Sequence, residues 1–295
     1  MSQGLNEVGR LSAVLIKHAR DAFVSQHVID AQWRRLNFSA PPHFHRATRE
    51  YDAFLELLMH TGAEILELPA DDRVTLDSLY TRDASIIARR GSIACSMGKA
   101  ARQSESSVQE EYLSGRGLAI AGRIEVPGVL EGGDLVWLDD GLVAVGVGKR
   151  TNQAGVEQLR GLLGDTVRVI EVPLPDWESP QDVLHLMSLI SPVDHDLAVV
   201  YSPLLAEAFR EELCSRGCRL VEVPDEEFET MGTNVLALGP RDCLMPASTT
   251  PSGSGTMSNR FGRRWTSAAS ARRRSAACPT GDSSRHCLRC VIRSA

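Results

Sequence analysis

Residues 152–173 read NQAGVEQLRGLLGDTVRVIEVP, a helical pattern that passes into a strand pattern. Apolar residues recur at three- and four-residue spacing as far as Leu163, which predicts an amphipathic helix. Gly164 stands where a helix C-cap is expected, because glycine adopts the left-handed conformation at little cost. The apolar run that follows predicts a strand, which should end at Pro173 because proline has no N–H to donate to a sheet.

The closing phrase of this segment, apolar-Glu-apolar-Pro, occurs four times along the chain. Its prolines are Pro69, Pro127, Pro173 and Pro224, at intervals of 58, 46 and 51 residues. A helical pattern and a glycine also precede the first and fourth phrases, in HRATREYDAFLELLMHTG and PLLAEAFREELCSRG. A repeated unit of about 50 residues is typical of a propeller or another repeat architecture. Five units would fill the 295 residues, with a fifth strand expected near residue 275.

The composition is that of a globular protein, with 43% hydrophobic and 24% charged residues. No apolar stretch approaches the roughly 20 residues that a membrane span requires, and the N-terminus shows no signal cleavage pattern. We therefore expect a cytoplasmic protein without a membrane partner. Seven cysteines at irregular spacing, without paired CxxC motifs, indicate neither a disulfide framework nor a structural zinc site.

The net charge of −6 hides a difference between residues 1–246 and residues 247–295. The latter, called the tail below, contain nine Arg and one acidic residue, a local charge of +8, so the first 246 residues carry −14. An acidic body argues against nucleic acid as a partner and suits a cationic small molecule. The tail has only six Val, Ile, Leu, Met, Phe or Trp residues beside ten Ser, which predicts disorder. We interpret the abrupt change as a frameshift near codon 247, with a natural basic tail as the alternative.

Two segments place acidic side chains beside predicted strands. In TLDSLYTRDAS, Asp77 and Asp83 flank a strand-like Leu-Tyr pair. Residues 130–140, LEGGDLVWLDD, place two glycines directly after Glu131. Glycine within a strand is costly, so this pair predicts that a ligand approaches Glu131 closely. The text after it reads as a strand, a turn and a second strand.

Two further segments add basic side chains. In GVGKRTNQAG, Arg150 closes a strand and Thr151 or Asn152 is a candidate helix cap. In DVLHLMSLIS, His185 lies inside an apolar run. Each residue also has an ordinary structural explanation: the two Asp residues as turn residues, an ion pair between Glu131 and Arg150, and a hydrogen-bonded core histidine. Together they favour a site, because strand ends of a cyclic repeat converge on its axis.

The order of these motifs resembles that of a known superfamily. TRDAS, MGKAARQSE, EGGDLVWL, GKRTNQAG, LHLMSLISPVD and GTNVLALGP follow one another as in the guanidino-group modifying enzymes. These are the arginine deiminases, dimethylarginine dimethylaminohydrolases and amidinotransferases, and the resemblance covers residues from about 10 to 246. It implies a pentein fold, an α/β propeller of five pseudo-repeats of about 50 residues. Residues 1–246 would be the catalytic domain, with the fifth repeat degraded or disordered in the tail.

The resemblance also implies a chemistry. Asp83 and Glu131 would hold a planar guanidinium by charge-assisted hydrogen bonds, with Asp77 lining the same pocket. A cysteine thiolate would attack the guanidinium carbon and form a thiouronium, while His185 transfers protons. Arg150 would position the substrate. This chemistry needs no cofactor and no metal, the partner is a small guanidino substrate, and the superfamily is compatible with a homodimer.

The branch of the superfamily is suggested by the residue two positions after His185. Arginine deiminases show His-x-Asp there, whereas this chain has Met187. We expect the less polar site to favour a methylated nitrogen, and so hydrolysis of dimethylarginine to citrulline and a methylamine. Arginine deimination is the first alternative.

The nucleophile of the superfamily lies near the C-terminus in Gly-Gly-x-x-Cys, which this chain lacks. Cys287 has a suitable distance from the end, and Cys278 and Cys290 are weaker candidates. A catalytically inactive protein that binds arginine derivatives is therefore a second alternative.

Overall fold

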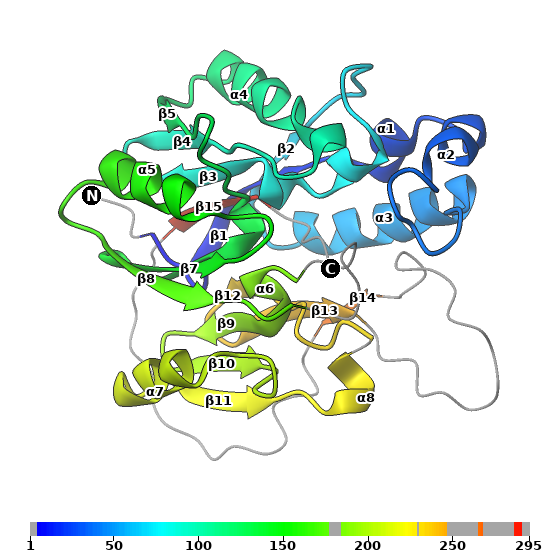
Figure 1. Cartoon of the computed structure of the whole chain (residues 1–295). Helices are drawn as coiled ribbons and strands as arrows, with labels where there is room; N and C mark the ends of the chain where they lie inside the picture. Colours follow the sequence, from blue (N-terminus) through cyan, green and yellow to red (C-terminus); the bar gives the residue numbers. More distant parts are fainter. Residues whose placement is uncertain (1–4, 177–183, 229, 247–264, 268–285, 291–295) are drawn as a thin grey trace.

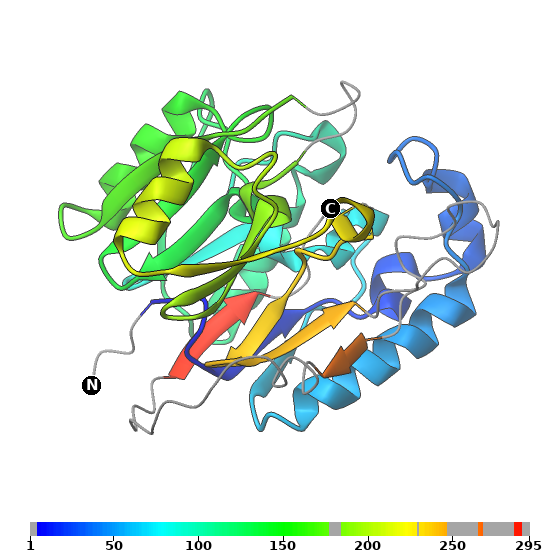
Figure 2. The ribbon, with the colours of Figure 1, turned by 90° about the horizontal axis from the view of Figure 1, so that it is seen from below.

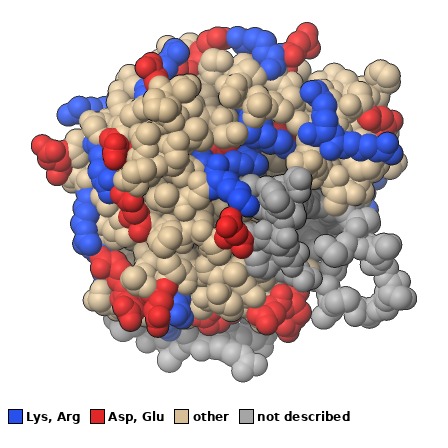
Figure 3. All heavy atoms as spheres, in the orientation of Figure 1, with Lys and Arg blue, Asp and Glu red and all other residues tan. Residues whose placement is uncertain are grey.

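The computed structural model describes residues 5–176, 184–228, 230–246, 265–267 and 286–290. Within these ranges, no helix has both the length and the apolar character that crossing a membrane would require. Figure 3 shows basic and acidic side chains interspersed over the face seen in Figure 1. The negative charge of residues 1–246 therefore forms no single acidic patch on the described part of that face.

The segment around residues 152–173 forms one complete structural unit. Strands β6 (Leu135–Asp139) and β7 (Leu142–Val147) form an antiparallel hairpin, and helix α5 (Gln153–Leu163) leads to β8 (Arg168–Pro173), parallel to β7. The Asn152 side chain caps α5 by accepting a hydrogen bond from the N–H of Gly155. Gly164 follows the helix with a φ of 74°. The predicted hairpin, cap, helix and strand are confirmed.

Two further units repeat this order of strand, strand, helix and strand. One comprises β3 (Ser85–Ala88), β4 (Gly91–Ala94), α4 (Glu105–Gly115) and β5 (Ile120–Arg123). The other comprises β9 (Ile190–Asp194), β10 (Leu197–Val200), α7 (Glu207–Ser215) and β11 (Arg219–Glu222). The sequence did not reveal α4, because much of its buried surface is polar: Gln109, Glu105 and Ser106 lie inside with Val108 and Leu113.

The remaining two sheets each take one strand from the tail. Strands β1 (Arg10–Ile16) and β2 (Glu64–Glu67) are parallel and joined through helix α3 (Phe44–Met59), and β15 (His286–Cys290) pairs with β1. Strands β12 (Leu236–Gly239) and β13 (Asp242–Pro246) form a hairpin, and β14 (Trp265–Ser267) pairs with β13.

The tail strands run in the opposite direction from their counterparts in the three complete units. In each complete unit the first strand is antiparallel to the middle strand and the third is parallel to it. In the first sheet β15 is parallel to β1, and in the last sheet β14 is antiparallel to β13. The position near residue 275 lies outside the described residues.

The α/β class is confirmed, and the described strands form five separate three-stranded sheets. No strand pairing among the described residues joins these sheets into one closed sheet. Figure 1 shows α4, α5 and α7 at the periphery of the molecule, and Figure 2 gives the view from below. Some connections between strands are buried, among them Thr81–Asp83 and Gly132–Asp134, whereas the hairpin turns at residues 89–90 and 195–196 are exposed.

Short helices lie in those connections. They are α1 (Ala19–Phe23), α2 (Gln26–Gln32), η1 (Leu76–Leu79), η2 (Thr81–Asp83), η3 (Ala100–Arg102), η4 (Gly132–Asp134), α6 (Leu186–Leu189) and α8 (Asp225–Phe228). The prediction of a strand between Asp77 and Asp83 is wrong. Two 3-10 turns stand there instead, because Tyr80 N–H bonds to the Asp77 carbonyl and Asp83 N–H to the Tyr80 carbonyl.

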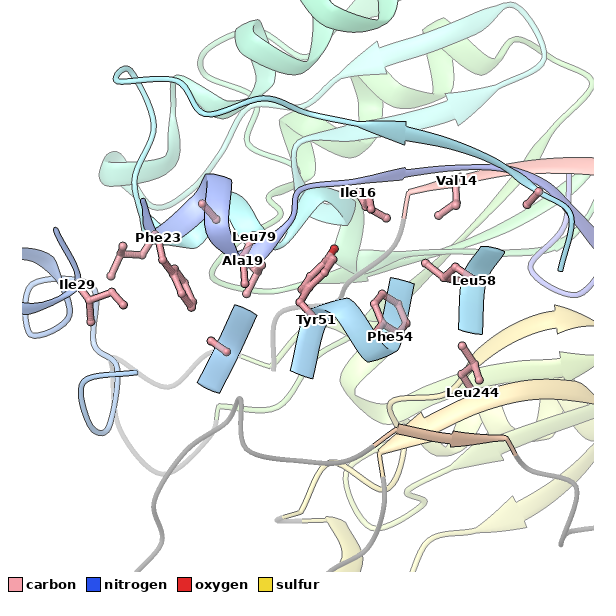
Figure 4. Close-up of a cluster of buried hydrophobic side chains, with 14 of the residues drawn as sticks. Val14, Ile16, Ala19, Phe23, Ile29, Tyr51, Phe54, Leu58, Leu79 and Leu244 are labelled. Atoms are coloured by element: carbon pink, nitrogen blue, oxygen red, sulfur yellow. The ribbon is translucent and has the colours of Figure 1, made fainter. Parts of the chain in front are cut away.

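The largest apolar cluster in the described residues lies between α3 and the first sheet. Figure 4 shows Tyr51, Phe54 and Leu58 of α3 in this cluster with Val14 and Ile16 of β1. Full burial of each such Phe, Leu or Ile stabilises the fold by roughly 1.5–3 kcal/mol. The C-terminal end of β1 is thereby held in place, and there the Leu15 carbonyl accepts a hydrogen bond from the Thr81 hydroxyl of η2 at 3.1 Å.

Candidate active site

The turn η4 places two carboxylates side by side. Glu131 immediately precedes this turn and Asp134 ends it, and the turn is closed by a hydrogen bond from the Asp134 N–H to the Glu131 carbonyl at 3.0 Å. A Cβ on Gly132 would lie 2.2 Å from the Arg82 carbonyl oxygen, and one on Gly133 would lie 2.5 Å from Asp83 Oδ1. The reason that we gave for the glycines therefore needs correction. They are required because protein atoms approach the turn closely, and the space beside Gly133 belongs to Asp83.

Glu131 is fully buried and receives three kinds of donor. Arg150 Nη1 lies 3.1 and 3.2 Å from its two oxygens, and His185 Nε2 lies 2.9 Å from Oε2. The N–H of Gly98 donates to Oε1 at 2.9 Å. Burial raises the pKa of Glu131, but the hydrogen bond and the charge of His185, together with Arg150, lower it well below its usual value. Glu131 is therefore a carboxylate throughout the physiological pH range.

Asp83, the last residue of η2, lies in the same group. One oxygen each of Asp83 and Glu131 and a ring nitrogen of His185 lie within 4.8 Å of one another. Asp83 Oδ2 accepts a hydrogen bond from Arg102 Nη1 at 2.7 Å, whereas the buried Oδ1 has no hydrogen-bond partner among the described residues. A buried carboxylate oxygen without a donor is costly, so this atom marks a position where a ligand donor is expected.

His185 is the N-cap residue of α6 and is buried. Burial lowers its pKa, but the negative charges of Asp134, Asp83 and Glu131 outweigh burial and raise the pKa to about 9. The imidazole is consequently protonated at neutral pH and can donate a proton. His185 is thus buried and hydrogen-bonded, as the structural explanation of the apolar run expected, and its partner is a carboxylate of the candidate site.

Asp134 holds the backbone around the site. Its Oδ2 accepts a hydrogen bond from Thr151 Oγ1 at 2.6 Å, and its Oδ1 accepts one from the N–H of Leu186 at 3.0 Å. Burial raises the pKa of Asp134 to about 6, despite the opposing effects of His185 and Thr151. Thr151, a candidate helix cap in the sequence, thus bonds to Asp134 while Asn152 caps α5.

Asp77 stands apart from this group. Its Oδ2 accepts a hydrogen bond from Lys99 Nζ at 2.6 Å, and Lys99 also donates to the Leu36 carbonyl at 2.7 Å. Among the described residues, the group of close acidic and imidazole side chains contains Asp83, Glu131 and His185 but not Asp77. The structure brings three of the predicted residues together and places Arg150 on one of them.

Sequence reasoning missed Arg102 and Glu105. Both are buried, and Arg102 binds Glu105 through two hydrogen bonds as well as Asp83. Burial raises the pKa of Glu105 to about 7, although Arg102 opposes this effect. The signal was the Arg-x-x-Glu spacing in MGKAARQSE, which brings the two side chains together across one helical turn.

Two of the three candidate cysteines lie within the described residues, and both are in β15. Cys287 pairs with Leu11 through the backbone of β15, and this strand lies beside η2, which carries Asp83. Cys290 ends β15, and Cys278 lies outside the described residues. Of the cysteines whose side chains are described, Cys218 has its pKa raised to about 11 by burial, and burial also raises the pKa of Cys243. Neither environment favours a thiolate nucleophile.

The three-residue group also has the spacing of a metal site, but its chemistry favours an organic cation. Arg102 and Arg150 already place positive charge on the two carboxylates. A guanidinium instead requires planar acceptors such as the free Asp83 oxygen.

Known proteins share this arrangement of sequence and fold. A family model for arginine deiminase matches residues 76–214. The dimethylarginine dimethylaminohydrolase of Streptomyces coelicolor is 33% identical over 204 residues, which cover 68% of this chain and 71% of that protein. The chain belongs to the guanidino-group modifying superfamily.

Other members of the superfamily agree. The dimethylarginine dimethylaminohydrolase of Pseudomonas aeruginosa is 26% identical over 212 residues, 70% of this chain and 75% of that protein. A structure of a Pseudomonas aeruginosa dimethylarginine dimethylaminohydrolase with citrulline matches with a TM-score of 0.61, at 22% identity over 77% of this chain and 81% of that one. The structural likeness shows the superfamily fold.

Proposed function

We propose that the protein hydrolyses dimethylarginine to citrulline and dimethylamine. Two relatives are named for that activity, and the alignment with each of them covers about two thirds of this chain. The observation that carries the proposal is the convergence of Asp83, Glu131 and His185 within 4.8 Å, with one Asp83 oxygen lacking a donor. We also propose that the five sheets form the five-unit propeller that the repeat predicts.

The substrate guanidinium binds between the two carboxylates. One N–H donates to Asp83 Oδ1, and the guanidinium replaces Arg150 at Glu131. Replacement is required because Glu131 already accepts four hydrogen bonds, about the number that a carboxylate can take. Arg150, once released, pairs with the substrate carboxylate, which is the positioning role expected from the sequence.

The reaction proceeds in two steps. A thiolate, assigned by resemblance to Cys287, forms an S–C bond to the guanidinium carbon. As the C–N bond to dimethylamine breaks, His185 donates its proton to the leaving nitrogen and a thiouronium remains. Water then adds to the same carbon and gives a proton to His185. The C–S bond breaks and restores the thiolate, the remaining hydroxyl proton passes to solvent, and citrulline is released.

Met187 gives little support to the choice of substrate. We expected its side chain to face a methylated nitrogen. It is buried in an apolar cluster with Leu186, Leu189 and Val136, and no described contact joins it to Asp83 or Glu131. The choice therefore depends on the relatives, and the match to the arginine deiminase model favours arginine deimination as the second candidate.

The experiment is a comparison of products. The full chain is incubated with dimethylarginine or with arginine, and citrulline, dimethylamine and ammonia are quantified. The proposal predicts equal amounts of citrulline and dimethylamine, and no citrulline from Cys287→Ser. Faster release of ammonia from arginine would instead identify a deiminase.

The inactive alternative has its own test. Binding of dimethylarginine by calorimetry without citrulline would identify a non-catalytic binding protein. Reading codons 240–295 in all three frames would then show whether a Gly-Gly-x-x-Cys phrase lies in another frame. If such a phrase is found, the altered tail explains why the chain is inactive.

A further inference from the structure

Asp134 is a buried charged residue that the proposed chemistry does not use. It lies near the reacting groups but outside the close group of Asp83, Glu131 and His185. Both its oxygens are occupied, one by the Thr151 hydroxyl and the other by the Leu186 N–H. These two donors come from separate connections in the fold, so Asp134 joins them.

The two donors follow directly after the two cations that bind Glu131. Arg150 precedes Thr151, and His185 precedes Leu186. In each dipeptide the first residue gives its side chain to Glu131 and the second gives a hydrogen-bond donor to Asp134. The N–H of Glu131 also donates to Thr151 Oγ1 at 3.3 Å.

The two carboxylates of this turn, Glu131 and Asp134, therefore bind two dipeptides. These are Arg150-Thr151 and His185-Leu186. The spacing Glu-x-x-Asp is needed for this, because the hydrogen bond that closes the turn runs from the N–H of Asp134 to the carbonyl three residues earlier. The two glycines between them are needed as well, because a Cβ on either one would overlap with η2 or His185. The motif EGGD thus specifies both the carboxylate that binds Arg150 and His185 and the carboxylate that binds the residues after them.

We propose that Asp134 is a positioning residue that fixes the approach of Arg150 and His185 to Glu131. The same geometry brings the negative charge of Asp134 near the imidazole, and this charge raises the pKa of His185. Its importance for turnover rests on the proposed function, but its effect on His185 does not. The charges around His185 are the carboxylates of Glu131, Asp83 and Asp134, and the guanidinium groups of Arg150 and Arg102 on two of those carboxylates.

The test is the titration of His185 in Asp134→Asn. The asparagine keeps an oxygen for the Leu186 N–H and removes the charge. NMR follows the imidazole of His185, whose signal is identified among the eight histidines by its loss in His185→Asn. We expect the pKa of His185 to fall by about one unit or more, as for the loss of a nearby opposite charge.

One control variant and one further test variant distinguish the effect of the Asp134 charge from the effect of its hydrogen bonds. Asp139→Asn removes an exposed carboxylate from β6, near η4 in sequence, and should leave His185 unchanged. Thr151→Val removes one of the two hydrogen bonds that hold Asp134 while keeping its charge. Because it loosens the geometry alone, it should lower the pKa of His185 by less than Asp134→Asn does. This variant also serves if Asp134→Asn does not fold.

An unchanged His185 pKa in a folded Asp134→Asn, or in Thr151→Val if only that variant folds, would overturn the proposal, even if either variant were less stable. The measurement does not depend on turnover, so an inactive wild-type chain would contradict the proposed function alone. If the chain is active, the basic limb of the pH profile of kcat should move to lower pH in Asp134→Asn.

Discussion

Glu131 and Asp134 lie three residues apart on one turn, are both fully buried, and have pKa values shifted in opposite directions. Glu131 has two cationic partners within hydrogen-bond distance, which outweigh burial and lower its pKa. Asp134 has only neutral donors at that distance, so burial dominates and raises its pKa to about 6. Glu131 is therefore suited to binding a cation. The ionised form of Asp134, in contrast, destabilises the folded state relative to its protonated form.

Asp134→Asn should make the protein more stable above pH 6. A carboxyl whose folded pKa is raised above its unfolded value loses stability as the pH rises, here from 3.8 to about 6. The amide avoids this loss and keeps an acceptor for Leu186. We expect its unfolding free energy at pH 7.5 to exceed that of the wild type by on the order of a few kcal/mol. Urea unfolding at pH 4 and pH 7.5 measures this, and an equal difference at both pH values would contradict it.

His185→Asn should remove a different pH dependence. The folded pKa of His185 is raised from 6.5 to about 9, so its stabilising contribution is complete below pH 6.5 and is lost as the pH rises to 9. Wild-type stability should fall across this window, and His185→Asn should be flatter. Thermal unfolding at pH 6, 7.5 and 9 provides the comparison, with His195→Asn, an exposed histidine, as the control. Parallel curves for His185→Asn and the wild type would contradict the assignment.

Gly132→Ala should lower the stability of the fold, whereas Gly133→Ala should weaken ligand binding. A Cβ on Gly132 meets the Arg82 backbone, which cannot move easily, so that variant should lose stability. A Cβ on Gly133 meets the Asp83 carboxylate and the His185 ring, so that variant should fold but bind dimethylarginine at least about tenfold more weakly. Gly161→Ala is the control, because nothing lies within 4 Å of its Cβ and alanine favours α5 by about 0.5–1 kcal/mol. Full binding by Gly133→Ala would show that the space beside Asp83 is not the site.

Arg150→Ala should separate two kinds of ligand. Removing Arg150 frees Glu131 for a guanidinium, so methylguanidine, which lacks a carboxylate, should bind several-fold more tightly than to the wild type. Dimethylarginine loses a partner for its carboxylate and should bind about tenfold more weakly. Calorimetry with both ligands tests this, and Arg160→Ala, which removes an exposed ion pair with Glu171, should change neither. Weaker binding of both ligands would argue against the exchange of Arg150 between Glu131 and the substrate.

The sequence was sufficient at several positions where neighbouring residues decide the structure. The Asn152 cap, the turn between β6 and β7, and the glycines after α5 and α7 depend on neighbouring residues and were predicted correctly. The repeat also predicted that residues from separate units would meet, and Asp83, Glu131 and His185 do meet.

Two internal ion pairs could not be predicted, because they join short turns that are separated in sequence by strands. Arg102 reaches Asp83 over 19 residues, and its partner role depends on how η2 and η3 pack. The same holds for Lys99 and Asp77, which pair over 22 residues. The pair of Glu131 and Arg150, in contrast, was one of the structural explanations that the sequence offered, and it is present. The directions of β14 and β15 were likewise not visible, since the tail lacks the apolar periodicity that specifies register.

Calorimetric titration of dimethylarginine into the wild type, Asp83→Asn and Glu131→Gln tests the central claim most directly. The claim is that the unpartnered oxygen of Asp83 and the paired carboxylate of Glu131 hold a guanidinium. We predict measurable binding to the wild type and a loss of at least about tenfold in each variant. Equal affinities for all three proteins, or no binding by a folded wild-type chain, would contradict it.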